Sequence, residues 1–271
     1  TGSPEVGRLV AEACGRNLIP AKMELGGKGA AVVFEDVDVS ETAAKLVGAI
    51  TFHTGQVCCD ATRWLVHKRV YDDFVSECSK LLKQVNVGYQ MDGDTQMGPV
   101  VNEKQRKRVL SYLEKGVKEG AKLNTDGRGV QPMEPANGFF VGPTIFDHVA
   151  PQMQIVRDEI FGPVLSVMRM EDLSDAIAQA NQSQYGNGAV IFTRDGGAAR
   201  TFARYANCGM IGVNVGVPAP MAIFPFTGWN QSFFGDLHIQ GTEGFHFYTH
   251  NKVVLSRWPS PEDPGKRVLG W

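Results

Sequence analysis

The stretch Ala30-Ala31-Val32-Val33-Phe34 decides the fold class, because a short, continuous apolar run of this kind predicts a fully buried strand. A helical pattern follows over residues 40–51, with Ser40 as its expected N-cap. A second short apolar run, Trp64-Leu65-Val66, predicts another strand. Short apolar runs that alternate with helical patterns are typical of an α/β fold with a parallel-rich sheet.

The same alternation continues along the chain. The clearest helical period runs from Tyr71 to Val85 and predicts that Cys78 is a core residue. Residues 124–138 are rich in Gly, Pro, Asn and Asp and predict a surface loop. We expect further helices over 102–119, 171–182 and 197–206, strands over 144–149, 164–170, 189–193 and 210–215, and a turn at 185–188.

The end of the chain differs in character. The proline-rich stretch 217–225 can continue neither a helix nor a central strand, so we place a boundary there. Residues 245–258 begin with a period-two alternation and predict a long strand late in the chain. Such a strand can lie at a sheet edge or add to the sheet of a partner.

Composition excludes several classes of protein. The 271 residues are 43% hydrophobic and 21% charged, as in an ordinary globular protein with a well-buried core. The net charge of −2 provides no basic field, so we expect no nucleic-acid partner. We also expect no membrane partner, because no apolar run approaches the about 20 residues that a spanning helix needs.

Cysteine and histidine usage indicates the compartment and argues against a metal site. The five cysteines show neither zinc-ligand spacing nor the count of a disulfide scaffold. A reducing, cytoplasmic compartment is therefore expected. The six histidines show no ligand spacing either, so we predict no metal site.

The first residues predict an anion site. Thr1-Gly2-Ser3 leads directly into a helical pattern, and free N–H groups at a helix start favour phosphate. The alternative is an ordinary helix start with no ligand. A loop that opens a helix normally follows a strand, which is missing here, so we expect the chain to be the carboxyl-terminal part of a longer protein.

Two short motifs could carry chemistry. Met23-Glu24-Leu25-Gly26-Gly27-Lys28 places Glu24 in an apolar approach, where burial would raise its pKa and suit it to act as a base. In Gly55-Gln56-Val57-Cys58, the N–H groups of the turn could lower the thiol pKa and hold an oxyanion. The alternatives are a solvated glutamate and, for Cys58 and Cys59, two buried small residues. Asp60 would raise the pKa of the Cys58 thiol if it faced the sulfur.

A third motif, Asp158-Glu159-Ile160-Phe161-Gly162-Pro163-Val164, is a tight turn before a strand. Glu159 could hold the hydroxyl pair of a ribose, and Phe161 could pack on a flat ring. The alternative is a surface acid and a core aromatic residue.

In their order and spacing, TGSxxVG, ELGGK, GQxC and EIFGPV resemble the motifs of the aldehyde dehydrogenase superfamily over essentially the whole chain. The resemblance implies oxidation of a small-molecule aldehyde to a carboxylic acid with NAD or NADP, NAD being favoured. It implies that Cys58 attacks the aldehyde and retains a thioester after hydride transfer. Glu24 resembles the base that activates the water for hydrolysis.

The resemblance also implies how the cofactor is held. Gly2, Ser3 and the following helix match the pyrophosphate contact, and the Leu25-Gly26 backbone matches the segment beside the carboxamide. Glu159 matches the residue that holds the nicotinamide ribose, and Phe161 matches the residue that packs near it.

The final third, with YGNG, FGDLHIQGTEG and FYTHNKVVLSRW, is most similar to the methylmalonate-semialdehyde dehydrogenase branch, which transfers the acyl group to coenzyme A. Two positions depart from that branch: Glu24 is present where the branch usually lacks a base, and Val57 stands where it usually has arginine. Both departures favour hydrolysis. A CoA-acylating semialdehyde dehydrogenase is the alternative, and a non-catalytic assembly module is a third hypothesis.

The superfamily further implies a division of the chain. Residues 1–24 would end an NAD(P)-binding domain, residues 25–222 would form the catalytic domain, and residues 223–271 would form a return segment with an oligomerisation strand. A homo-oligomer is the assembly that this division implies.

Overall fold

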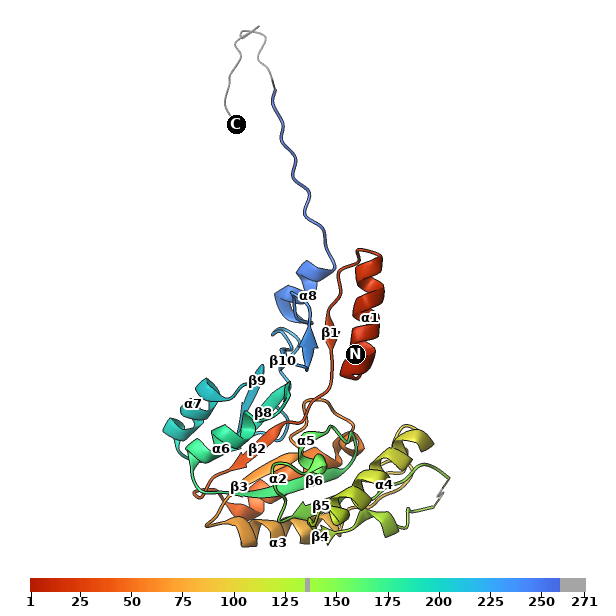
Figure 1. The fold of residues 1–271 in the computed structure, drawn as a ribbon, viewed down its shortest axis with the longest axis vertical. Coiled ribbons are helices and arrows are strands. Elements are labelled where there is room, and N and C mark those ends of the chain that lie inside the picture. The colour runs from red at the N-terminus through yellow and green to blue at the C-terminus, as the bar shows by residue number, and fades with distance from the viewer. Residues whose placement is uncertain (135–136, 259–271) are drawn as a thin grey trace.

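The computed structural model describes residues 1–134 and 137–258, and their main feature is a seven-stranded sheet (Figure 1). Only the edge strand β4 runs antiparallel to its neighbour, so the predicted α/β fold with a parallel-rich sheet is confirmed. In spatial order the strands are β4 (Lys122–Thr125), β5 (Thr144–Asp147), β6 (Val164–Met170), β3 (Arg63–His67), β2 (Ala30–Val33), β8 (Gly188–Phe192) and β9 (Met210–Val213).

Helices cover both faces of this sheet, which explains why its central strands are continuous apolar runs. One face packs on α2 (Val39–Thr51) and α3 (Tyr71–Leu82), where Cys78 is fully buried as predicted. The other face packs on α4 (Glu103–Lys118), α6 (Leu173–Ala180) and α7 (Gly196–Tyr205).

Several expected boundaries shift. Helix α2 begins at Val39, and its N-cap is Asp38 in place of Ser40; the Asp38 carboxylate accepts a hydrogen bond from the Glu41 N–H at 2.9 Å. The earlier start lets Val39 pack against the core. The first residues of the expected 124–138 loop belong to β4, and residues 135–136 of that loop lie outside the described residues.

The expected turn at 185–188 also contains a short strand. Residues Tyr185–Gly186 form β7, which pairs with β10 (Trp229–Asn230) from the far end of the chain. A long-range partner of this kind is not visible in a local turn pattern.

A smaller group of elements stands beside the sheet (Figure 1). It contains α1 (Pro4–Arg16), the antiparallel pair of β1 (Met23–Glu24) and β11 (Phe233–Phe234), and α8 (Gly241–Phe247). The pairing of β1 with β11 places residues 23–24 beside residues 233–234.

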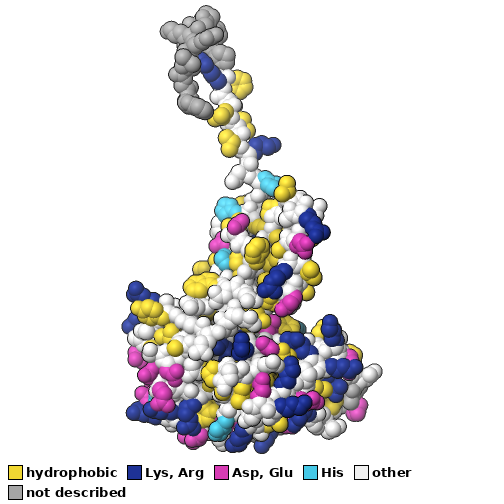
Figure 2. Space-filling model, viewed as in Figure 1, with side chains coloured by type: hydrophobic (Ala, Val, Ile, Leu, Met, Phe, Trp, Pro, Cys, Tyr) yellow, Lys and Arg dark blue, Asp and Glu magenta, His cyan; other side chains and the backbone are white. Residues whose placement is uncertain are grey.

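The strand predicted over 245–258 does not form within the described chain, and its addition to the sheet of a partner stays a prediction. Its first three residues belong to α8, and the rest has no strand pairing among the described residues. A strand needs a neighbour for its backbone groups, and Figure 1 shows this segment running away from the body. Figure 2 shows hydrophobic side chains along it. Val253 and Leu255 in this segment are 85% and 95% exposed.

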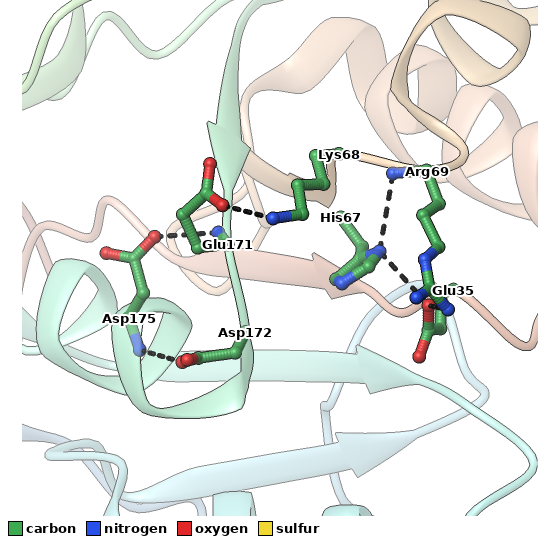
Figure 3. A network of polar contacts seen from close by, with 7 residues as sticks. All are labelled: Glu35, His67, Lys68, Arg69, Glu171, Asp172 and Asp175. Atoms are coloured by element: carbon green, nitrogen blue, oxygen red, sulfur yellow. Dashed lines mark hydrogen bonds and ion pairs between the residues drawn. The ribbon is translucent and has the colours of Figure 1, made fainter.

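Different groups of residues lie at the two ends of the parallel strands. At the carboxyl ends, ion pairs join the loops: Arg69 lies 2.5 Å from Glu35, and Lys68 lies 2.5 Å from Glu171 (Figure 3). Open α/β sheets commonly bind ligands at this edge. Here the ion pairs connect its loops, and the candidate catalytic residues lie at the opposite edge.

No helix in residues 1–134 and 137–258 combines the length and the apolar character needed to cross a bilayer.

Candidate active site

The candidate site lies at the amino ends of the central strands. The loops that precede β2, β3 and β6 carry Gly26, Cys58 and Glu159, and the start of α1 lies beside them. Together they line a cavity of about 920 Å³. The structure thereby brings together seven of the eight sequence-predicted site residues in one cavity wall: Gly2, Ser3, Leu25, Gly26, Cys58, Glu159 and Phe161.

A strained turn leads the chain from α2 to Cys58. His53, Thr54 and Gly55 all have positive φ angles, of 49°, 59° and 65°. A Cβ atom at Gly55 would lie 2.4 Å from the Gly162 carbonyl oxygen, so this turn packs directly against the loop that carries Glu159. Gln56 fastens the turn, because its Oε1 accepts a hydrogen bond from the Val101 N–H at 2.9 Å.

The two glycines of the first motif let the loops approach one another. A Cβ atom at Gly27 would lie 1.7 Å from the Cys58 carbonyl oxygen. A Cβ atom at Gly26 would lie 2.6 Å from a carboxylate oxygen of Glu159. Neither position has room for a side chain, and this explains the Gly-Gly pair by contact.

The electrostatic surroundings of Cys58 favour its thiolate. A hydrogen bond from the Cys59 thiol and the nearby amide of Asn187 lower the pKa of Cys58 to about 7, against the opposing effects of burial and Glu159. The pKa of Cys59 is raised in turn, so the negative charge of the pair belongs to Cys58. The charge of Asp60 raises the pKa of Cys59.

Glu24 lies on β1 and is 6% exposed. Within the described residues neither of its carboxylate oxygens has a hydrogen-bond partner. Burial, and then the charge of Cys58, raise the pKa of Glu24 to about 7. Glu24 does not line the large cavity, but its motif meets the Cys58 loop at Gly27, where a Cβ atom would touch the Cys58 carbonyl group.

The Glu159 loop provides an acid and an aromatic ring. The Glu159 Oε1 accepts a hydrogen bond from the Gly27 N–H at 2.8 Å, and burial raises the pKa of this carboxyl. Phe161 has a φ of 58° and is 37% exposed, at the cavity wall. Gln105 holds this conformation, because its Nε2 donates to the Phe161 carbonyl oxygen at 2.6 Å.

The start of α1 has part of its hydrogen-bonding capacity occupied. The Ser3 hydroxyl caps the helix by accepting from the Val6 N–H at 3.4 Å, and the Gly2 N–H donates to the Glu24 carbonyl oxygen at 3.1 Å. Glu5 adds a negative charge to the first turn. The pyrophosphate contact of Ser3 stays a prediction.

Two residues near the site carry no role in the sequence analysis. Lys28 is 2% exposed, and its ammonium has no hydrogen-bond partner in the described chain; burial lowers its pKa to about 7. Asn187 is also 2% exposed, and neither of its amide atoms completes a hydrogen bond within the described residues. One signal could have found Asn187: it directly precedes a strand, as the residues of the Cys58 loop do.

Among the residues that the structure describes, no group of three or more His, Cys, Asp and Glu side chains is arranged to hold a metal ion.

Known proteins are similar to this chain in sequence and in fold. The malonate-semialdehyde dehydrogenase of Bacillus subtilis strain 168 is 42% identical over 261 residues, which cover 96% of this chain and 53% of that protein. A Sinorhizobium meliloti 1021 protein described as a methylmalonate-semialdehyde dehydrogenase, solved with NAD, matches with a TM-score of 0.92 at 37% identity, over 97% of this chain and 54% of that chain.

The methylmalonate-semialdehyde dehydrogenase of Oceanimonas doudoroffii also matches, with a TM-score of 0.92 at 35% identity, over 96% of this chain and 54% of that chain. The chain thus spans about half the length of the relatives it matches. Residues 1–254 match the aldehyde dehydrogenase family as a whole. With this match and these relatives, the chain belongs to the aldehyde dehydrogenase family.

Proposed function

We propose that this chain carries the nucleophile and the general base of an NAD-dependent enzyme that oxidises an aldehyde to a carboxylic acid. The observation that carries the proposal is geometric: Cys58 lines the cavity, and the motif that contains Glu24 meets the Cys58 loop at Gly27, which packs on the Cys58 carbonyl oxygen. Cys58, with its pKa lowered to about 7, contributes to raising the pKa of the buried Glu24 to about 7. A thiolate beside a base of near-neutral pKa is what acyl transfer through a thioester requires.

The first step belongs to Cys58. Its thiolate attacks the aldehyde carbon, a C–S bond forms, and the carbonyl oxygen takes the negative charge of a thiohemiacetal. Loss of a hydride from that carbon restores the C=O bond and leaves a thioester on Cys58. Bound NAD supplies the acceptor for this hydride.

The cavity wall fits a dinucleotide in its donor set. Glu159 is a partly buried carboxylate that can accept hydrogen bonds from ribose hydroxyls, and Gly26 has no side chain to obstruct its approach. Phe161 presents a partly exposed ring at the same wall. We assign the ribose contact to Glu159, the ring contact to Phe161, the carboxamide contact to the Leu25-Gly26 backbone, and the pyrophosphate contact to Gly2 and Ser3.

The second step belongs to Glu24. Its carboxylate takes a proton from a water molecule, the water oxygen adds to the thioester carbon, and the C–S bond breaks to release the acid. A pKa of about 7 makes Glu24 a stronger base than an ordinary carboxylate, and at neutral pH a large fraction remains ionised.

The assembly and the compartment are parts of the same proposal. We assign residues 1–24 to the end of an NAD(P)-binding domain, 25–222 to the catalytic domain, and 223–271 to a return and oligomerisation segment. The exposed apolar side chains of residues 253–255 support association with a second copy. The five cysteines are free, which supports a reducing cytoplasmic compartment.

A second candidate is transfer of the acyl group to coenzyme A by a semialdehyde dehydrogenase. The observation that favours it is the 42% identity to a malonate-semialdehyde dehydrogenase. The two candidates share Cys58 and the thioester and differ only in the acceptor.

The test is aldehyde-dependent NADH formation by the natural protein that contains these 271 residues, with and without coenzyme A. We expect turnover without coenzyme A, and its loss in Cys58→Ala. Turnover only with coenzyme A would favour the second candidate. Undiminished turnover of Cys58→Ala would overturn both.

A further inference from the structure

Asn187 occupies a defined position beside the nucleophile. It directly precedes β8, at the same sheet edge as the Cys58 loop. Its backbone is held in place, because its carbonyl oxygen accepts a hydrogen bond from the Met210 N–H at 3.1 Å. On its other side, the Gly186 N–H donates to the Ser232 hydroxyl at 3.0 Å. These hydrogen bonds fix the backbone position from which the Asn187 side chain extends.

Gly27 shows how close Asn187 and Cys58 are. A Cβ atom built on Gly27 would lie 1.7 Å from the Cys58 carbonyl oxygen and 3.4 Å from the Asn187 Cβ. The two residues thus pack against the same side of the same glycine. The Asn187 amide is near enough to the Cys58 sulfur to lower the pKa of its thiol.

Burial of this amide is costly in the resting protein. The side chain is 2% exposed, and neither Oδ1 nor Nδ2 completes a hydrogen bond within residues 1–134 and 137–258. An unpaired buried polar group destabilises the folded state. A thiol is a poor acceptor for the amide N–H, whereas a thiolate is a charged one. The unused donor is therefore suited to the ionised sulfur.

We propose that Asn187 is a catalytic residue, whose amide N–H donates a hydrogen bond to the Cys58 sulfur whenever that sulfur carries negative charge. This assignment rests on the proposed function of Cys58. It gives Asn187 two moments of action. The first is before attack on the aldehyde, when the free thiolate must be available. The second is release of the acid, when the C–S bond breaks and the sulfur departs with the electron pair. Asn187 exchanges no proton in either.

The test measures the ionisation of Cys58 without requiring turnover. Iodoacetamide alkylates thiolates, so the rate of Cys58 labelling against pH reports the pKa of its thiol. Mass spectrometry of the peptide, with Cys58→Ala as a blank, assigns the label. Asn187→Leu keeps the approximate volume and removes both polar atoms. We expect its labelling midpoint to rise by about one pH unit, with labelling about tenfold slower below the midpoint.

Asn187→Asp keeps the shape and replaces the amide with a carboxylate. Its midpoint should rise further, because a second negative charge opposes the thiolate. Asn181→Leu is the matched control. That amide donates to the Tyr205 carbonyl oxygen at 2.9 Å, and its removal should leave the midpoint unchanged. A purely structural Asn187 would instead lower the melting temperature of its variants and leave the midpoint in place. That result overturns the proposal.

A measurement on the unaltered side chain covers the case in which the variants do not fold. In NMR spectra, the chemical shifts of the Asn187 Nδ2 amide should change with pH at the ionisation midpoint of Cys58. In Cys58→Ala this pH-dependent change should disappear. Constant signals would contradict the proposal. The proposed function of Cys58 has a separate test. A labelling midpoint of about 8.5 in the unaltered chain, as for an ordinary cysteine, would reject Cys58 as an activated nucleophile.

Discussion

Gly27 packs against the carbonyl group of Cys58, and this contact sets the position of the loop that carries Cys58. The same glycine donates its N–H to Glu159, so one residue contacts both Cys58 and Glu159. Four buried polar side chains around it, Glu24, Lys28, Asp60 and Asn187, each have atoms without a hydrogen-bond partner in the described chain. Such groups destabilise a fold, so their concentration at one edge is the signature of a functional site.

Gly27→Ala should displace the Cys58 loop, because the new methyl group would lie 1.7 Å from the Cys58 carbonyl oxygen. We expect a loss of about 1–3 kcal/mol of unfolding free energy and at least tenfold slower alkylation of Cys58. The control is Gly48→Ala in α2, where nothing lies within 4 Å of the new atom. That variant should gain about 0.5–1 kcal/mol from helix propensity. Equal behaviour of the two variants in chemical denaturation would refute the packing argument.

Glu24→Gln should change stability with pH in a defined direction. Both states of the wild-type chain hold the Glu24 proton below the unfolded pKa of 4.5. Between 4.5 and about 7 the unfolded state loses this proton and the native state keeps it, so wild-type stability falls as pH rises through that window. Glutamine removes the effect. We expect the melting temperature of the variant relative to wild type to be higher at pH 8 than at pH 4, and a constant difference would contradict the shift.

At the scale of elements, the sequence predicts strands and helices well where the pattern is local. The apolar run 30–34 and the helical period from Tyr71 need no information from elsewhere in the chain. The pairing of β1 with β11 and of β7 with β10 joins segments about two hundred and about forty residues apart, and no local pattern indicates it. The pattern at 245–258 is local, but a strand also needs a neighbour, and alternation alone does not indicate one within the described chain.

The candidate site divides in the same way. Local motifs predict Cys58, Glu24 and Glu159 as site residues, because each is a reactive or charged residue beside a glycine-containing turn. Asn187 comes into the site only through the parallel alignment of β8 with β2, which places their amino ends together. The strain at Thr54 is equally invisible in the sequence, since a β-branched residue rarely adopts a positive φ.

Asp38→Ala tests whether the geometry of the Cys58 loop depends on the stability of α2. The Asp38 carboxylate caps the helix that leads to Cys58, and its loss should cost about 1 kcal/mol of unfolding free energy. Gln56 and Gly27 hold the loop independently, so the alkylation midpoint of Cys58 should not move. Urea denaturation and pH-dependent labelling measure the two effects. A shifted midpoint would mean that the loop depends on the start of the helix.

At the scale of the whole molecule, two features extend beyond the sheet. The large cavity lies between the sheet edge and α1. Residues 248–258 leave the body with their apolar side chains exposed (Figures 1 and 2). A row of exposed Val253, Val254 and Leu255 is unusual for a surface that stays in water. Association through this segment would bury it.

Leu255→Asp should therefore weaken self-association. Leu255 is 95% exposed, so the substitution costs the folded chain little and places a charge where an apolar contact is expected. Sedimentation velocity over a concentration series compares the variant with wild type. Lys252→Asp, which changes a neighbouring polar position, is the control. A wild-type chain that stays monomeric at every concentration would remove the basis of the oligomer proposal.

The central claim is that Cys58 forms a thioester which Glu24 resolves. Glu24→Gln should interrupt the reaction between these events and slow hydrolysis by about 10²–10⁴-fold. Rapid mixing of the natural protein carrying this substitution with propanal and NAD, followed by peptide mass spectrometry, measures both products. The account predicts a burst of about one NADH per chain and a propionyl group on the Cys58 peptide. Continued turnover with no acyl group on Cys58 would contradict it.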